Sequence, residues 1–136
     1  MSRLRKVVDF SSVAGSPHSL AILVVEDHAN TAQSIQRYLR QRGHRVHVAS
    51  DVRSARALAA SVKFDLLLSD IGLPDGNGWE LLEELCTDRS IRAIAMSGYD
   101  TDADRARSKA AGFLEHLAKP LTPNELDRAF ERAMTR

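Results

Sequence analysis

From residue 20 onward, short apolar runs alternate with segments in which apolar residues recur at the spacing of a helix. Apolar runs of strand length are typical of strands that are buried on both faces of a sheet. The expected strands are residues 20–25, 45–48, 65–70, 91–96 and 113–117. Each is followed, after a short loop, by a segment with helical periodicity. Strict alternation of strand and helix predicts an α/β fold with a parallel sheet and helices on both faces.

Several residues mark where these helices begin and end. Gly43 is a good C-terminal stop for the first helical segment. Thr122 followed by Pro123 predicts a capped start for the last helix. Residues 74–78 contain Pro, Asp, Asn and Gly and are expected to form a loop.

Length and composition favour one soluble domain. The chain has 136 residues, of which 43% are hydrophobic and 27% are charged, close to the average for globular proteins. No apolar run approaches the ~20 residues that a transmembrane helix needs, and no apolar segment follows the basic residues near the N-terminus. Cys86 is the single cysteine, so no intrachain disulfide can form. The domain is expected to be cytoplasmic.

Residues 1–19 differ in composition from the rest of the chain. Residues 11–19 are small and polar, as in a linker. Residues 1–20 hold three basic side chains and one acidic one, whereas residues 21–136 hold 16 and 17. This balance argues against a dedicated binder of nucleic acid or anionic membranes. We expect residues 1–19 to be an N-terminal tail or interdomain linker and residues 20–136 to be the domain.

Polar side chains follow four of the five expected strands. Ligands bind at the carboxyl ends of the strands in parallel sheets of this type. The residues expected there are Glu26, Asp27, Asp70, Ser97, Lys119 and Pro120. Three carboxylates at one edge repel one another and need a cation, and hard oxygen ligands suit Mg²⁺. A carboxylate can also attack phosphorus and form an aspartyl-phosphate, while Mg²⁺ and Lys119 neutralise the developing charge.

Each of these residues has an ordinary explanation when it is taken alone. An Asp at a strand end usually belongs to a turn or a helix cap, and a lone Ser or Lys is usually solvated. The signal is their joint occurrence in this order along the chain. Taken together over about residues 20–135, they resemble the receiver domain of two-component response regulators. Residues 69–78 look like that family's loop after the phosphorylated Asp.

The resemblance implies both a fold and a function. The fold is a flavodoxin-like (βα)5 doubly wound parallel sheet with strand order 2-1-3-4-5. The function is that of a phosphorelay module, which accepts a phosphoryl group from a phosphohistidine and switches conformation. Asp70 would be the acceptor, and a histidine kinase or a histidine phosphotransfer protein would be the donor.

The resemblance also gives the neighbouring residues roles. Asp27 would bind Mg²⁺ directly together with Asp70, and Glu26 would bind it mainly through water. The backbone carbonyl of Gly72 would be a further ligand. Lys119 would pair with the phosphoryl group.

The remaining roles concern the conformational switch and dephosphorylation. At these positions the sequence departs from the family pattern in two respects. Ser97 would bond a phosphoryl oxygen and shift on activation, and Pro120 would follow a cis peptide bond. The switch aromatic of the family is replaced by His116, for which a half-exposed strand residue is the alternative interpretation. Gly72 and Tyr99 occupy the variable positions that are thought to tune autodephosphorylation.

Two enzyme classes fit less well. A haloacid-dehalogenase-like phosphohydrolase carries a second Asp two residues after its nucleophile, where this chain has Gly72. A nucleotide-binding Rossmann enzyme needs glycines in its first strand-to-helix turn, and residues 26–30 contain none. The isolated domain is therefore not expected to be a conventional enzyme beyond its own phosphorylation and dephosphorylation, although a parent chain can be a histidine kinase.

The context of the domain stays open between two architectures. The linker-like residues 1–19 and the likeness of the loops after Asp70 and Ser97 to those of hybrid proteins favour the C-terminal receiver of a hybrid sensor histidine kinase. The alternative is a stand-alone response regulator. In the family the fourth helix, fifth strand and fifth helix relay the signal, so the charges in residues 100–109 and 125–132 are candidates for a partner surface, including a homodimer. No direct contact with nucleic acid or membrane is expected.

Overall fold

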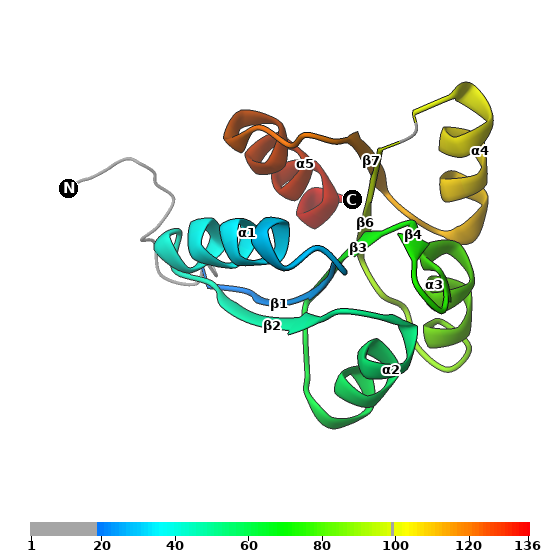
Figure 1. Ribbon diagram of the computed structural model, residues 1–136, viewed down its shortest axis with the longest axis horizontal. Helices are drawn as coiled ribbons and strands as arrows, with labels where there is room; N and C mark the ends of the chain where they lie inside the picture. The colour runs from blue at the N-terminus through cyan, green and yellow to red at the C-terminus, as the bar shows by residue number, and fades with distance from the viewer. Residues whose placement is uncertain (1–18, 99) are drawn as a thin grey trace.

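The computed structural model describes residues 19–98 and 100–136, and it contains one parallel five-stranded sheet with helices on both faces (Figure 1). The strands of this sheet are β1 (Ala21–Val25), β2 (Arg45–Ala49), β3 (Leu66–Asp70), β6 (Ala93–Ser97) and β7 (Glu115–Ala118). Their order is β2-β1-β3-β6-β7, and every neighbouring pair is parallel. Counted along the chain, this is the predicted order 2-1-3-4-5. The predicted tail, residues 1–19, lies outside the described residues except for Ser19.

Five helices cover the two faces of the sheet. They are α1 (Ala29–Gln41), α2 (Val52–Ser61), α3 (Gly78–Leu85), α4 (Asp102–Ala111) and α5 (Pro123–Thr135). Figure 1 shows α1 and α5 on one side and α2 and α3 on the other. Among the described residues, no helix is long and apolar enough to cross a membrane.

The core explains why the three central strands, β1, β3 and β6, are nearly continuous apolar runs. Alternate residues of each strand point to opposite faces. Val24 and Leu68 therefore pack with α1 and α5, whereas Val25 and Leu67 pack with α2 and α3. All four of these side chains are fully buried. Both faces of the sheet exclude water, so polar residues are displaced to the strand ends, where the candidate site forms.

Helix ends follow the sequence signals, with one exception. Thr122 caps α5 through a reciprocal hydrogen-bonding box with Glu125, as expected. The predicted loop over residues 74–78 is only partly correct. Short antiparallel strands β4 (Gly72–Leu73) and β5 (Gly76–Asn77) flank its turn, and Gly78 already belongs to α3. The side chain of Asn77 caps α3 by accepting a hydrogen bond from the backbone N–H of Glu80, so the helix begins earlier than expected.

Tyr38 joins α1 to α5 and predicts a loss of stability in alkali. Its hydroxyl donates to the carboxylate of Asp127, with O···O distances of 2.8 and 2.9 Å. Burial and this carboxylate raise the pKa of Tyr38 to about 12, whereas a free tyrosine titrates near 10. The protonated phenol therefore stabilises the fold below pH ~10, and this contribution is lost as the pH rises through ~12.

The Tyr38→Phe variant tests this linkage. We expect it to be about 1 kcal/mol less stable than the wild type at neutral pH, because the partly buried hydrogen bond is screened by water. The difference should shrink between pH ~10 and ~12, where the wild type loses the same bond. Urea unfolding at the two pH values measures it, and a difference that stays constant across this range would contradict the assignment.

Candidate functional site

Four strand ends meet at one edge of the sheet, as the sequence predicts. Glu26 follows β1, Asp70 ends β3, Ser97 ends β6 and Lys119 follows β7. The chain moves from β1 to β2 on one side and then crosses to β3 on the other side, so the edge beside β1 and β3 is the topological switch point. Adjacent parallel strands thereby bring together residues that are far apart in the sequence.

Lys119 links the two buried carboxylates. Its Nζ lies 2.5 Å from Oε1 of Glu26 and 2.8 Å from Oδ2 of Asp70. The exposed fraction of the side chain is 0% for Glu26, 8% for Asp70 and 20% for Lys119. One ammonium is therefore shared by two carboxylates in a largely dry pocket, and one negative charge is left over.

The pKa values of the two carboxyls shift in opposite directions, although Lys119 acts to lower both. Burial raises the pKa of Asp70, and the negative charge of Glu26 raises it further, although Lys119 opposes both effects. Burial also acts to raise the pKa of Glu26, but hydrogen bonds from Lys119 and the backbone N–H of His28 outweigh it and leave that pKa lowered. Burial lowers the pKa of Lys119, but bonds to both carboxylates raise it more. Asp70 is thus the carboxyl whose ionised form is least favoured without a further cation.

The donor set beside Asp70 fits a hard divalent cation. One ligand atom from each of Glu26, Asp27, His28 and Asp70 lies within 4.8 Å of the others. Oδ1 of Asp27 is buried and has no hydrogen-bond partner in the described part of the chain. A cation would satisfy this oxygen and offset the excess negative charge of the cluster. Carboxylate oxygens are the ligands that Mg²⁺ prefers.

His28 follows the acidic pair directly, and the structure places its ring beside the site. It is the N-cap of α1, and its Nδ1 lies 3.2 Å from Oε2 of Glu26 and 3.4 Å from Oδ1 of Asp27. Its position directly after the acidic pair was the signal for this proximity. Two glycines also shape the site, and only Gly72 was predicted to do so. Gly72 lies in β4, with nothing within 4 Å of a Cβ built on it.

Gly78 allows α3 to approach the backbone of Asp70 closely. A Cβ at Gly78 would lie 2.5 Å from the carbonyl oxygen of Asp70, a distance that real Cβ atoms do not adopt. The N–H of Gly78 donates to the carbonyl of Ile71 at 2.8 Å, which holds the two segments together. The sequence pattern predicts a loop at this glycine, and it contains no signal for the backbone that the glycine approaches.

Ser97 and Lys119 are linked through the backbone. The Lys119 N–H donates to the carbonyl of Ser97 at 2.8 Å, and the Lys119–Pro120 peptide bond is cis, as the resemblance implies. Ser97 is buried at the end of β6. Tyr99, the other residue assigned to dephosphorylation tuning, lies outside the described residues.

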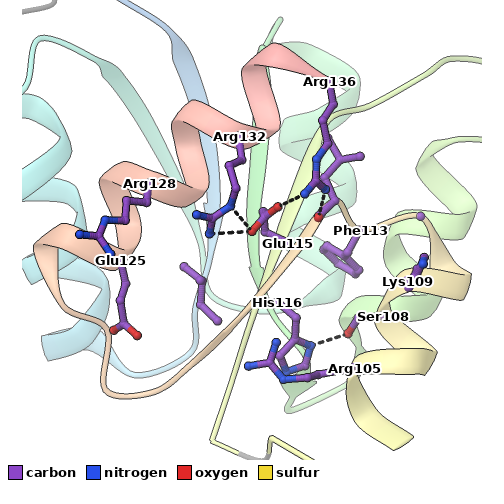
Figure 2. Close-up of a pocket in the computed structure, with 13 residues that line it drawn as sticks. Arg105, Ser108, Lys109, Phe113, Glu115, His116, Glu125, Arg128, Arg132 and Arg136 are labelled. Atoms are coloured by element: carbon purple, nitrogen blue, oxygen red, sulfur yellow. Dashed lines mark hydrogen bonds and ion pairs between the residues drawn. The ribbon is translucent and has the colours of Figure 1, made fainter. Parts of the chain in front are cut away.

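His116 is buried, so the alternative interpretation of a half-exposed strand residue is wrong. Its Nδ1 lies 2.8 Å from the hydroxyl of Ser108, which also accepts a hydrogen bond from the indole N–H of Trp79 at 2.9 Å (Figure 2 shows the first contact). Only 9% of His116 is exposed because α4 packs over the edge strand β7. Its Nε2 lies 3.8 Å from Asp100 and has no hydrogen bond in the described part of the chain.

Comparison with known proteins identifies the family. The family model for the response regulator receiver domain matches residues 22–131. The chain therefore belongs to the response regulator receiver domain family, and it is a receiver domain of two-component signalling.

Individual relatives agree with this assignment. A CheY-like response regulator receiver domain protein from Methanospirillum hungatei JF-1 has a similar structure, with 29% identity, a TM-score of 0.75 and coverage of 85% of this chain and 98% of that chain. The KDP operon transcriptional regulatory protein KdpE of Escherichia coli (strain K12) is 33% identical over 119 residues, which cover 85% of this chain and 51% of KdpE.

The relatives differ in length. An uncharacterized 14.6 kDa protein of Leptolyngbya boryana is 33% identical over 114 residues, and the match covers 82% of this chain and 87% of that protein. The chain spans about half the length of the transcriptional regulators that it matches. Placement in a hybrid histidine kinase stays a prediction.

Proposed function

We propose that Asp70 of this receiver accepts the phosphoryl group from the phosphohistidine of a histidine kinase or a histidine phosphotransfer protein, in a Mg²⁺-dependent reaction. The observation that supports it most strongly is the position of Asp70. It ends β3 at the switch point of the sheet, with Nζ of Lys119 at 2.8 Å and the carboxylates of Glu26 and Asp27 beside it. A carboxylate held in this way can act as a nucleophile toward phosphorus.

The chemistry transfers one phosphoryl group between two side chains. An oxygen of Asp70 bonds to phosphorus while the phosphorus–nitrogen bond of the donor breaks, and that electron pair returns to the imidazole nitrogen. Lys119 neutralises negative charge on the phosphoryl oxygens. Mg²⁺, when bound, would neutralise further charge on those oxygens. Asp27, Asp70 and the Gly72 carbonyl would hold it, and Glu26 would do so through water.

The proposed switch lies at the ends of β6 and β7. The Ser97 hydroxyl would bond the new phosphoryl group, and its backbone bond to Lys119 would make the two strand ends respond together. His116 lies three residues before Lys119 and contacts α4 through Ser108. Phosphorylation would therefore shift the population of α4 conformations through contacts that already exist.

Intact mass spectrometry tests the proposal. The protein is incubated with Mg²⁺ and a small-molecule phosphodonor, with EDTA as the control, and the modified peptide is sequenced. We expect the gain of one hydroxylamine-labile phosphoryl group on Asp70, only when Mg²⁺ is present. Modification of another residue, or equal modification in EDTA, would refute the proposal. Steady release of phosphate from many phosphate esters would favour the phosphohydrolase class instead.

The acidic cluster predicts that Mg²⁺ stabilises the fold. A ligand that binds only the folded state raises the melting temperature, and a concentration of 100 Kd corresponds to about 2.7 kcal/mol. Thermal unfolding with increasing MgCl₂ should show this rise in the wild type. Asp27→Asn should abolish most of it, because Asp27 supplies the buried oxygen that has no hydrogen-bond partner in the described part of the chain. CaCl₂ and NaCl at matched ionic strength are the controls, and an unchanged response in the variant would contradict the assigned ligand.

We also propose a localisation and a parent architecture for the domain. Family membership and the single cysteine support a cytoplasmic domain. The composition of residues 11–19 supports attachment to a hybrid sensor histidine kinase, and the match over most of the Leptolyngbya boryana protein supports a stand-alone regulator instead. We also propose that a homodimer forms through α4, β7 and α5, the face to which the charges of residues 100–109 and 125–132 belong.

A further inference from the structure

The chain that follows Asp70 forms a very short hairpin, which contains the proposed Mg²⁺ ligand Gly72. Its strands β4 and β5 are joined by only two antiparallel residue pairs, Gly72 with Asn77 and Leu73 with Gly76. Even longer two-stranded hairpins are only marginally stable in water when they are isolated. The position of the Gly72 backbone therefore depends on the neighbouring elements that the hairpin contacts.

The base of the hairpin is held by β3 and α3. The side chain of Asn77 caps α3, and the N–H of Gly78 donates to the carbonyl of Ile71 at 2.8 Å. Ile71 is buried in the same part of the core as residues of α2 and α3. These contacts fix the two ends of the hairpin but do not involve its turn, residues 74–75.

Asp75 joins this turn to the N-terminus of α2. One oxygen of its carboxylate accepts a hydrogen bond from the N–H of Val52 at 2.8 Å, and the other accepts one from the N–H of Arg53 at 3.1 Å. Val52 and Arg53 are the first two residues of α2, where N–H groups have no carbonyl partner within the helix. Gly76 also lies against this helix, since a Cβ built on it would lie 3.1 Å from Cγ2 of Val52.

Helix α2 also has a cap that does not involve the hairpin. The N-cap residue Asp51 accepts a hydrogen bond from the N–H of Ser54 at 2.8 Å and forms a reciprocal capping box with it. Two carboxylates thus share the first three N–H groups of α2, and only that of Asp75 comes from another element. Because α2 is packed on the sheet through Val52, Ala55 and Ala59, it is a firm support for the turn.

We propose that Asp75 is a positioning residue for the cation site, which fixes the hairpin on α2 and so holds the carbonyl of Gly72 where Mg²⁺ binds beside Asp70. This inference rests on the proposed function, because it takes Gly72 as a ligand. Asp75 is not among the described residues whose ligand atoms cluster beside Asp70, so it acts through the backbone of the hairpin. Groups that orient a metal ligand in this way usually change metal affinity about 10–100-fold.

Isothermal titration calorimetry of the full chain with MgCl₂ measures this effect. Asp75→Ala removes both hydrogen bonds to α2 and should weaken Mg²⁺ binding about tenfold. Asp75→Asn removes the same charge but keeps an oxygen that accepts a hydrogen bond. It should recover about half of the lost binding free energy, which leaves the affinity about threefold below that of the wild type.

Asp51→Ala is the matched control. It removes a carboxylate and a cap from the same end of α2 but leaves the bonds between Asp75 and the helix in place. It should lower the melting temperature, since an N-cap is lost, and change the Mg²⁺ affinity less than about twofold. Circular dichroism checks that every variant is folded.

Amide hydrogen exchange in EDTA tests the anchoring of the hairpin without any metal. Exchange reports local opening of the backbone. The amides of residues 72–77 should exchange faster in Asp75→Ala than in the wild type, whereas Asp51→Ala should leave their exchange unchanged. Equal exchange of this segment in all three proteins would overturn the anchoring role.

The titrations separate this proposal from the alternatives. If the wild type binds Mg²⁺ and Asp75→Ala binds it equally well, Asp75 is only a helix cap. Equal losses of affinity in Asp75→Ala and Asp51→Ala would assign the effect to a general loosening of α2. Equal losses in Asp75→Ala and Asp75→Asn would assign it to the missing charge. A wild type that binds no Mg²⁺ would refute the proposed Mg²⁺-dependent function itself, and the role of Asp75 with it.

Discussion

Asp70→Asn is expected to gain no phosphoryl group and also to be more stable than the wild type at neutral pH. The first effect follows because an amide is not a nucleophile toward phosphorus. The second follows from the raised pKa of Asp70, which means that the folded state disfavours its ionised form. An amide carries no charge to desolvate and does not repel Glu26, and its oxygen can still accept the hydrogen bond from Lys119. We expect a gain of about 1 kcal/mol, allowing for screening by water at the mouth of the site.

The pH dependence of the stability gained in Asp70→Asn distinguishes removal of an unfavourable charge from a general improvement in packing. A carboxyl with a raised pKa takes up a proton as the pH falls through its folded pKa, so the wild type then loses the unfavourable charge as well. The stability difference between the variant and the wild type should therefore be largest at neutral pH and shrink toward about pH 4. Urea unfolding at both pH values measures it. A variant that is less stable than the wild type at neutral pH would show that the interaction of Asp70 with Lys119 outweighs its burial.

The sheet was predictable because its determinants are local in the sequence. The first strand was expected over residues 20–25 and is observed at Ala21–Val25, and the third was expected over residues 65–70 and is observed at Leu66–Asp70. Continuous apolar runs can be buried only inside a sheet that is covered on both faces. The helix caps were also visible, since Thr122 bonds a residue only three positions away.

The site was predictable as a set of residues but not as a set of contacts. Strand order alone brings Glu26, Asp70 and Lys119 to one edge, but it does not show that one ammonium bonds both carboxylates or that Asp70 is the carboxyl with the raised pKa. These properties depend on side-chain directions and burial between residues 49 and 93 positions apart.

The orientation of the His116 ring also could not be predicted, because it depends on contacts with other elements. Its ring is fixed by Ser108 on α4, and Ser108 is in turn bonded by Trp79 from α3. The periodicity of a four-residue edge strand contains no information about either partner.

Lys119→Ala is expected to have the opposite effect on stability from Asp70→Asn, although both variants impair phosphorylation. Without the ammonium, Glu26 stays buried with no cation, and it repels Asp70 across the site. Removing one partner of a buried pair costs about 3–5 kcal/mol; because Lys119 is partly exposed, we expect about 2 kcal/mol at neutral pH. The rate of phosphorylation should fall at least ~100-fold, the usual effect of deleting one group that stabilises developing charge.

The pH dependence of the stability lost in Lys119→Ala identifies the missing cation as the cause of that loss. The raised pKa of Lys119 means that its charged form stabilises the fold at every pH below the pKa of the unfolded lysine. The lowered pKa of Glu26 means that its contribution is present above the unfolded pKa and is lost as the pH falls through the folded one. The cost of Lys119→Ala should therefore decrease in acid, as Glu26 and Asp70 take up protons and no longer need a cation. Mg²⁺ should also restore part of the lost stability at neutral pH, since it can neutralise the same carboxylates.

Lys63→Ala is the matched control, because Lys63 is exposed and forms no ion pair within the described residues. It should leave both stability and phosphorylation within the scatter typical of surface substitutions, about 0.5 kcal/mol. If Lys119→Ala were as stable as Lys63→Ala at neutral pH, the shared ammonium would not be what holds Glu26 and Asp70 together. Asp70→Asn removes the charge of the acceptor and Lys119→Ala removes the cation that faces it. Stabilisation by the first and destabilisation by the second would show that the ionised acceptor carboxylate is maintained for phosphorylation at the expense of the stability of the fold.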